Sequence, residues 1–373
     1  MDAAAVRHRT PPHHPTRHHT AAASIDGCGT AGSGHIRYHV SYVAQQERRL
    51  TMKAWMFKGL GSPLELVDLP DPTPAPGEVV VDLKAAGLCH SDVGITDGTL
   101  TEVLGFTPII LGHEAAGIVS AVGKGVTDAA IGDRVAISAM GDGQSGVIGQ
   151  KTIGIGRHGA YAQKTIAPAS ELIPIPDGVP FVQAAAATDA GMTSYHAVFV
   201  RGGLRPGMKV GIIGLGGLGM TGARMAVLGG AEVYAAEINA EVHAAGLERG
   251  VKQVVNDVTE LVPFGLDLIV DFAGFGTTTA GAIEAVRHGG RIVQVGVGRQ
   301  EATINTYLLA MKDLDLVGSV GGTPADTVEV IKFIASGGLT IATRTIGFHD
   351  IPAGLDELAR GVKGQRLVAS IDD

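Results

Sequence analysis

The sequence predicts an α/β protein, with a β-rich domain followed by a doubly wound parallel sheet. Short β-branched runs separated by Gly and Pro turns recur between residues 52 and 188. Beyond them, strand-like and helix-like segments alternate, and a glycine-rich turn, G-L-G-G-L-G at 214–219, joins the first pair. Because 45% of the 373 residues are hydrophobic and 18% are charged, a sizeable core can form and wholesale disorder is excluded.

The composition also narrows the function classes. The formal net charge of −8 argues against a general nucleic-acid binder. No run of roughly 18 or more strongly apolar residues is present, so we expect no membrane span. The 2 cysteines, Cys28 and Cys89, exclude a disulfide framework and a four-cysteine zinc cluster, which favours a reducing, cytoplasmic location.

Residues 1–51 differ from the rest of the chain. They hold seven of the 14 histidines, and six arginines against three acidic residues. No apolar periodicity is visible there, so the segment cannot bury enough surface to offset its ordering entropy, and we predict a disordered leader. A metal-binding histidine tract and an organelle transit peptide are the alternatives.

Strand-like runs begin at Met52 and recur at 64–67, 78–85, 115–122 and 134–138, which predicts a small barrel-like β domain. Two motifs interrupt this domain at strand-to-turn junctions, G-L-C-H-S-D at 87–92 and L-G-H-E at 111–114. The thiolate of Cys89 and the imidazole of His113 are ligand types that suit Zn²⁺. Buried cysteines are also common in apolar cores, so a packing role for Cys89 stays open.

The second part of the chain begins with the pattern of a dinucleotide-binding unit. The strand-like run Lys209–Ile213 enters the glycine-rich turn, and a helix-like stretch at 220–228 follows. In this setting Gly214 permits the turn, Gly216 lets a pyrophosphate approach the backbone, and Gly219 lets the helix pack on the strand. The amino terminus of the helix then faces the phosphates.

The next strand-like run, 231–236, ends at Glu237, 23 residues after the first glycine of the turn. A carboxylate there hydrogen-bonds the adenosine ribose hydroxyls and repels a 2′-phosphate, so NAD is favoured over NADP. An exposed strand-end carboxylate without that role is the alternative. Strand-like runs at 268–272 and 291–295, with a helix-like stretch at 278–287, complete the doubly wound sheet.

Four motifs therefore occur in one order, namely G-L-C-H-S-D at 87–92, G-H-E at 112–114, G-D-R-V at 132–135 and G-L-G-G-L-G at 214–219. On these motifs the chain resembles the zinc-containing medium-chain alcohol dehydrogenase family across residues 52–373. The resemblance implies a GroES-like catalytic domain at 52–189, a Rossmann NAD-binding domain at 190–320, and a segment at 321–373 that completes the catalytic domain.

The resemblance also assigns the metal ligands. Cys89, His113 and Asp189 look like ligands of a catalytic zinc ion, and Glu114 resembles the carboxylate that can exchange into its coordination. Without the resemblance, Asp189 would be interpreted as the N-cap of a helix that begins near Ala190.

Further residues resemble the family's catalytic and cofactor groups. Ser91 resembles the hydroxyl that passes on the alcohol proton, and Asp92 resembles a partner that orients a ligand, with a helix N-cap as its alternative. The position of a relay histidine in many members is Gly94 here. The implied NAD contacts are His90 and Arg366 at the pyrophosphate, Thr193, Val295 and Val297 at the nicotinamide, and Gly214, Gly216, Gly217, Leu218, Gly219 and Glu237.

Three departures besides Gly94 refine these expectations. Asp189 stands where many members have a cysteine, as in the secondary-alcohol branch. The four-cysteine lobe of a structural zinc is missing, because residues 139–158 contain no cysteine, so we expect one zinc ion. Ala139 stands where an aromatic side chain often narrows the substrate pocket, which favours bulky alcohols over ethanol.

The implied function is reversible hydride transfer between a small-molecule alcohol, secondary or bulky, and NAD, giving a ketone or aldehyde, with one zinc ion as Lewis acid. The resemblance also implies a homodimer or homotetramer, with no nucleic-acid or membrane partner. A zinc-free quinone or enone reductase of the same superfamily, a polyol or amino-alcohol dehydrogenase, and a catalytically silent binding protein are the alternatives.

Overall fold

The computed structural model describes residues 51–141, 149, 151–361 and 364–371. The contacts divide the chain into Met1–Arg48 and Arg49–Asp373, and the description that follows concerns the second unit. The predicted leader as far as residue 50, with Cys28, lies outside the described residues, as does part of the loop at 139–158. Among the described helices, none is both long and apolar enough to cross a bilayer.

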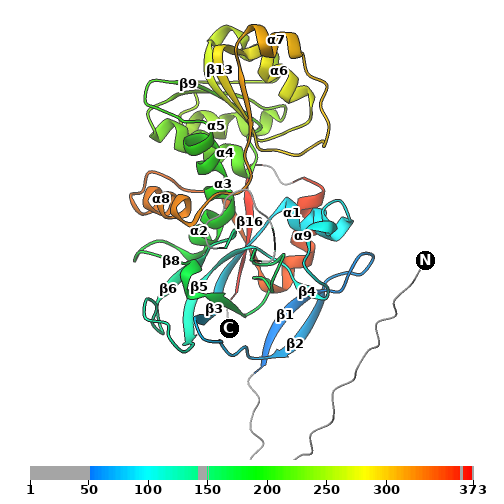
Figure 1. Cartoon of the computed structure of the whole chain (residues 1–373), viewed down its shortest axis with the longest axis vertical. Helices are drawn as coiled ribbons and strands as arrows, with labels where there is room; N and C mark the ends of the chain where they lie inside the picture. The colour runs from blue at the N-terminus through cyan, green and yellow to red at the C-terminus, as the bar shows by residue number, and fades with distance from the viewer. Residues whose placement is uncertain (1–50, 142–148, 150, 362–363, 372–373) are drawn as a thin grey trace, which may run out of the picture. The chain divides into compact units, whose positions relative to one another are not determined.

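A seven-stranded sheet joins early strands of the chain to the last strand (Figure 1). Within the described residues its order is β15-β16-β3-β5-β6-β8, and β7 pairs with β3. Its strands are β3 (Glu78–Leu88), β5 (Glu114–Val122), β6 (Arg134–Ile137), β7 (Lys164–Pro168), β8 (Leu172–Pro174), β15 (Thr343–Gly347) and β16 (Arg366–Ser370). A three-stranded sheet contains β2 (Glu65–Pro70), β1 (Thr51–Phe57) and β4 (Ile109–Ile110) in that order. The predicted strands are therefore present, with ends that differ by a few residues.

The two faces of the seven-stranded sheet are covered differently. One face packs on a core that includes Phe57 and Tyr161, and the other packs on the helix α2 (Phe181–Ala186). The alanines of α2 meet Ala85 and Ala116 of the sheet. Because the side chains on both surfaces are small, the helix backbone can approach the sheet closely. This approach carries the residues that follow α2 toward the strand ends.

The helical segment after Pro180 runs without a break to Arg201. It contains α2, a π-helical turn at Ala187–Gly191, α3 (Met192–Tyr195) and a second π-helical turn at His196–Arg201. Asp189 lies inside this segment, so the interpretation of Asp189 as a helix N-cap is wrong. The predicted domain boundary between residues 189 and 190 also falls inside the segment, and that boundary stays a prediction. Single π turns in helices are frequent at functional sites.

A six-stranded parallel sheet is formed by strands between residues 209 and 318, with the order β11-β10-β9-β12-β13-β14 among the described strands. This is the order of a doubly wound dinucleotide-binding sheet, so the predicted fold class is confirmed. The predicted helix at 278–287 is shorter than expected, because α6 ends at Ala285 and Val286 already begins a strand. The strands are β9 (Lys209–Ile213), β10 (Glu232–Ala236), β11 (Gln253–Val255), β12 (Leu266–Asp271), β13 (Val286–Gln294) and β14 (Asp315–Gly318).

The remaining described helices cover these sheets and connect their strands (Figure 1). The α-helices are α1 (His90–Asp97), α4 (Gly217–Leu228), α5 (His243–Glu248), α6 (Thr277–Ala285), α7 (Thr306–Met311), α8 (Pro324–Ala335) and α9 (Ile351–Ala359). Short 3-10 turns lie at Thr101–Val103, Ala169–Glu171, Ala240–Val242, Val258–Phe264 and Phe348–Asp350.

Candidate active site

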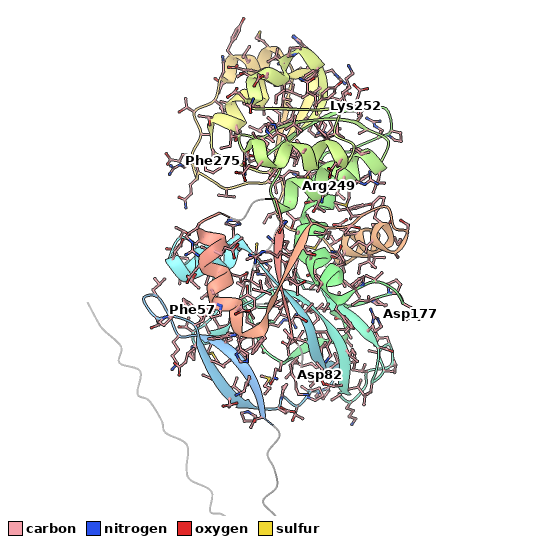
Figure 2. The ribbon with its side chains drawn as sticks, turned by 180° about the vertical axis from the view of Figure 1, so that it is seen from behind. Phe57, Asp82, Asp177, Arg249, Lys252 and Phe275 are labelled. Atoms are coloured by element: carbon pink, nitrogen blue, oxygen red, sulfur yellow. The ribbon has the colours of Figure 1, made fainter. Side chains whose placement is uncertain are left out.

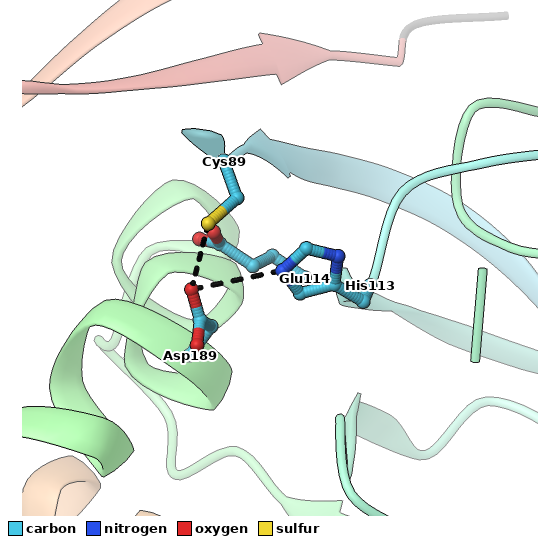
Figure 3. Close-up of side chains that lie close together, drawn as sticks. All are labelled: Cys89, His113, Glu114 and Asp189. Carbon is cyan, nitrogen blue, oxygen red and sulfur yellow. Dashed lines mark hydrogen bonds and ion pairs between the residues drawn. The ribbon is translucent and has the colours of Figure 1, made fainter. Parts of the chain in front are cut away.

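Three segments far apart in the sequence meet at one end of the seven-stranded sheet (Figure 3). Cys89 directly follows β3, His113 and Glu114 lie at the start of β5, and Asp189 comes from the first π turn. One ligand atom from each of these four residues lies within 4.8 Å of the others. The structure therefore brings together all four predicted metal ligands.

The donor atoms in this cluster suit a zinc ion. The Sγ atom of Cys89 lies 3.3 Å from Asp189 Oδ2, and His113 Nε2 lies 3.7 Å from the same oxygen. Thiolate, imidazole and carboxylate are the ligand types found in catalytic zinc sites, where three protein ligands leave one position open. Glu114 Oε2 is buried and has no hydrogen-bond partner among the described residues, which is unusual for a buried carboxylate. The residues present fit the metal.

Asp92 connects the two turns that carry Cys89 and His113. Its carboxylate accepts hydrogen bonds from the backbone N–H groups of Cys89 at 3.0 Å and Gly112 at 3.3 Å, and its Oδ1 lies 3.5 Å from His113 Nδ1. Burial would raise the pKa of Asp92, but His113 and the hydrogen bonds outweigh burial and lower the pKa. Asp92 occupies the third position of α1 and so also serves the helix start, with Cys89 as the N-cap residue. The interpretation of Asp92 as the helix N-cap is therefore wrong, because Cys89 is the N-cap and Asp92 is its capping-box partner at the third helical position.

Arg366 lies beside the four candidate metal ligands, although the family resemblance implies that it contacts a pyrophosphate. Its guanidinium is buried and pairs with Asp189 Oδ2 and Glu114 Oε1. Burial raises the pKa of both carboxyls, but for Asp189 the guanidinium, His113 and the hydrogen bond from Cys89 together outweigh burial and lower the pKa far below its ordinary value. The pKa of Glu114 rises to about 7, mainly through burial and against the pull of Arg366. No local signal in the sequence predicts this contact, because it depends on the pairing of β16 with β3.

Other predicted residues lie around the cluster. Ser91 Oγ is 3.1 Å from Cys89 Sγ, and Thr193 Oγ1 donates to Asp189 Oδ1 at 3.0 Å. His90 is exposed at the start of α1, where partial burial and the charge of Arg366 lower its pKa. Thr193 therefore lies one hydrogen bond away from the candidate ligands.

The glycine-rich turn lies between β9 and α4, as the sequence predicts. Gly214 has a φ of +84°, a conformation that favours glycine, and Gly216 is the N-cap of α4, whose first turn holds Gly217, Leu218 and Gly219. Glu237 follows β10, and its carboxylate accepts from the backbone N–H groups of Leu215 and Asn239, each at 2.7 Å. Glu237 thus holds the glycine-rich turn in place through these two hydrogen bonds.

A groove of about 470 Å³ lies at the carboxyl ends of the central parallel strands. Ligands of doubly wound sheets bind at this position, where the strand order reverses. Gly214 and Glu237 line the groove, together with Ile238, which is 89% exposed, and Phe275, which is 55% exposed and labelled in Figure 2. Val295 and Val297 follow β13, and Val297 is 74% exposed.

Comparisons with known proteins match both halves of the chain. The profile of the alcohol dehydrogenase GroES-like domain matches residues 75–177, and that of the zinc-binding dehydrogenases matches residues 217–336. An alcohol dehydrogenase of Geobacillus stearothermophilus is 31% identical over 339 residues, which cover 86% of this chain and 100% of the relative.

Two solved structures extend the comparison. Acetophenone reductase of Geotrichum candidum, determined in complex with NAD, has a TM-score of 0.77 at 30% identity, covering 86% of this chain and 97% of that protein. A thermostable alcohol dehydrogenase of Pyrobaculum aerophilum, determined with cobalt and zinc bound, has a TM-score of 0.76 at 25% identity. The match covers 86% of this chain and 100% of that protein.

The fold, the ordered motifs and these relatives define an oxidoreductase of the medium-chain dehydrogenase superfamily that uses NAD(P). Within it, the chain belongs to the zinc-containing medium-chain alcohol dehydrogenase family.

Proposed function

We propose that this alcohol dehydrogenase requires one zinc ion, held by Cys89, His113 and Asp189, with Glu114 as an exchangeable fourth group. The observation that carries the proposal is the gathering of these four donor groups within 4.8 Å at the ends of β3 and β5. The charge of the proposed site also supports the proposal, because Zn²⁺ with one thiolate, one neutral imidazole and one carboxylate has no net charge. A bound zinc ion would supply a Lewis acid that lowers the pKa of an alcohol oxygen.

The residues around the cluster have separate tasks in the proposed reaction. Ser91 accepts the alcohol proton and passes it outward, a role that its position beside Cys89 supports. Because Gly94 offers no side chain to extend this relay, the proton would leave through the ribose hydroxyls of the cofactor and water. Asp92 holds the backbone N–H groups of Cys89 and Gly112 in place.

The preferred cofactor in this proposal is NAD rather than NADP. Bound NAD would supply the acceptor for the hydride that leaves the alcohol carbon. Glu237 lines the groove beside the glycine-rich turn, where a carboxylate favours a ribose diol and repels a phosphate. The NAD complex of the Geotrichum candidum relative supports the same choice.

The proposed substrate is a secondary or ring-bearing alcohol, or the corresponding ketone. The proposal is supported by the small side chain of Ala139, which stands where the family often has an aromatic side chain, although Met140 and Met192 pack against it. The Geotrichum candidum relative is named as an acetophenone reductase, which is consistent with a ring-bearing ketone. We expect higher kcat/KM for 1-phenylethanol than for ethanol, and a preference for ethanol would contradict this choice.

The proposed assembly is a homodimer or homotetramer. Among the described strands, β14 is an edge of the parallel sheet. Met311, which precedes β14 in the sequence, is 57% exposed, and Val320, which follows it, is 43% exposed. An unpaired strand edge with exposed apolar neighbours favours pairing with another chain. Sedimentation of the full chain as a monomer at micromolar concentration would contradict this assembly.

Metal analysis and two variants test the zinc proposal. Asp189→Ala should give a folded protein with little bound zinc and turnover reduced by orders of magnitude, whereas Asp189→Cys should keep the metal and part of the activity. Thr188→Ala, at the neighbouring position, is the matched control and should keep zinc. Full turnover of Asp189→Ala without zinc would instead favour a zinc-free reductase.

A further inference from the structure

Tyr161 is fully buried beside the candidate metal centre. Its backbone N–H donates to Leu111 O at 3.0 Å, and its carbonyl accepts from Trp55 N at 2.8 Å. Its hydroxyl donates to Asp92 Oδ2 at 2.8 Å. The residue therefore joins β1 and the segment before His113 to the carboxylate of Asp92.

The ring of Tyr161 also packs directly on the turn that precedes His113. A Cβ atom added to Gly112 would lie 2.5 Å from Tyr161 Cδ1, much closer than side-chain contacts allow. Gly112 has a φ of +90°, which also favours glycine. The ring and the turn thus fit against each other with no space for another side chain, so the position of the ring limits where His113 can lie.

The contacts of Asp92 connect Tyr161 to both candidate ligand turns. Asp92 Oδ2 accepts from the Tyr161 hydroxyl and from Cys89 N–H, while Oδ1 accepts from Gly112 N–H and faces His113 Nδ1. Two of these contacts come from the backbone and cannot reorient, whereas the tyrosine supplies a side-chain hydroxyl from a third segment. The carboxylate is therefore fixed from several directions.

From these contacts we infer that Tyr161 is a positioning residue for the metal centre, one that holds the Asp92 carboxylate and thereby orients His113 and the turn of Cys89. Removing the hydroxyl leaves the carboxylate of Asp92 held by the backbone N–H groups of Cys89 and Gly112 alone, so the carboxylate is held less firmly and the orientation of the His113 imidazole, whose Nδ1 lies 3.5 Å from Oδ1, is less restricted. Outer partners of metal ligands commonly change metal affinity about 10- to 100-fold. Burial and the charge of Asp92 raise the pKa of Tyr161 well above 10.0, so its hydroxyl stays protonated and continues to donate.

The inference rests on the proposed zinc site, and its test does not use turnover. The full-length, zinc-loaded protein is mixed with a chromogenic chelator, and the rate of zinc release is measured for the wild type and for Tyr161→Phe. We expect release on the order of tenfold faster in Tyr161→Phe, and a changed visible spectrum after cobalt substitution. Tyr234→Phe is the matched control, because it removes a tyrosine hydroxyl from the carboxylate of Glu232 far along the chain in β10, and it should release zinc at the wild-type rate.

A double-variant comparison tests whether Tyr161 acts through Asp92. Asp92→Asn should release zinc faster than the wild type, and Tyr161→Phe added to Asp92→Asn should bring no further increase. Independent, multiplying effects of the two changes would overturn the inference. The inference would also be overturned if Tyr161→Phe released zinc at the wild-type rate and kept the wild-type cobalt spectrum. A lower melting temperature of this variant would not change that conclusion, because it would indicate only a structural role. A wild-type protein that binds no zinc at all would overturn the proposed function itself, a result that metal analysis distinguishes.

Discussion

The guanidinium of Arg366 pairs with the carboxylate of Asp189, a residue 177 positions earlier in the sequence. The same guanidinium also pairs with Glu114, so one cation lies between two carboxylates of the candidate metal centre. β16 brings it there, because Leu367 lies opposite Leu88 and Cys89 follows at the end of β3. The end of the chain thus supplies the counter-charge of the site.

Replacing this cation should destabilise the metal-free protein. Arg366→Met leaves the buried carboxylate of Glu114 and the partly buried carboxylate of Asp189 without this partner, and breaking a buried pair costs about 3–5 kcal/mol of unfolding free energy. Zinc should reduce the loss, because the metal replaces the missing positive charge. Urea unfolding with and without a chelator measures both values. Arg344→Met is the control, since its pair with Glu357 is exposed and exposed pairs contribute about 0–1 kcal/mol. Equal losses in the two variants would contradict the prediction.

Cofactor preference should follow the charge at the end of β10. Glu237→Ser combined with Ile238→Arg removes the carboxylate and adds a cation beside the groove, so the ratio of kcat/KM for NAD to that for NADP should fall at least about tenfold. Glu248→Ser removes an exposed acid of α5 and should leave this ratio unchanged. An unchanged ratio in the double variant would show that Glu237 does not face the ribose.

Two glycines of the nucleotide turn should respond differently to alanine. A Cβ atom at Gly219 would lie 1.8 Å from Gly214 O, whereas a Cβ atom at Gly216 meets nothing within 4 Å. Gly219→Ala should therefore lower the unfolding free energy by about 1–3 kcal/mol or more, because backbone must shift. Gly216→Ala should melt like the wild type but bind NAD more weakly, since the methyl group occupies the approach of the pyrophosphate. Thermal melting and NAD titration separate the two effects, and equal melting temperatures would contradict the packing argument.

Asp326 should contribute stability that acid removes. Burial would raise its pKa, but hydrogen bonds with His196 and Thr323 outweigh burial and lower it. Because the native pKa is below the unfolded value, the contribution is present above about pH 4 and is lost as the pH falls through the native pKa. Asp326→Asn should melt at a lower temperature at pH 6 and show a flatter decline between pH 5 and pH 3. The exposed Asp315→Asn should keep the wild-type profile, and identical slopes in all three proteins would refute the linkage.

The sequence predicts the strands and the nucleotide turn well, because their signals are local. The run 209–213, the turn glycines and Glu237 all lie where periodicity and spacing place them. The local sequence does not predict that Asp189 lies inside a helix, because an acid before a helix-like stretch favours an N-cap. Only the packing of α2 on the sheet shows that the helix starts earlier. The contacts of Arg366 and Tyr161 could not be predicted, because each depends on which distant strands pair.

The position of β16 has a consequence for how the protein is made. Cys89, His113, Glu114 and Asp189 are all synthesised in the first half or just beyond it, but β3 gains its neighbour β16 only when residues 366–370 have left the ribosome. Until then the Ala85–Leu88 part of β3 keeps an unpaired edge, while Glu78–Asp82 can already pair with β7, and the candidate metal centre lacks Arg366. A nascent chain stalled shortly before residue 366 should therefore remain sensitive to protease around β3, and longer incubation should not remove this sensitivity.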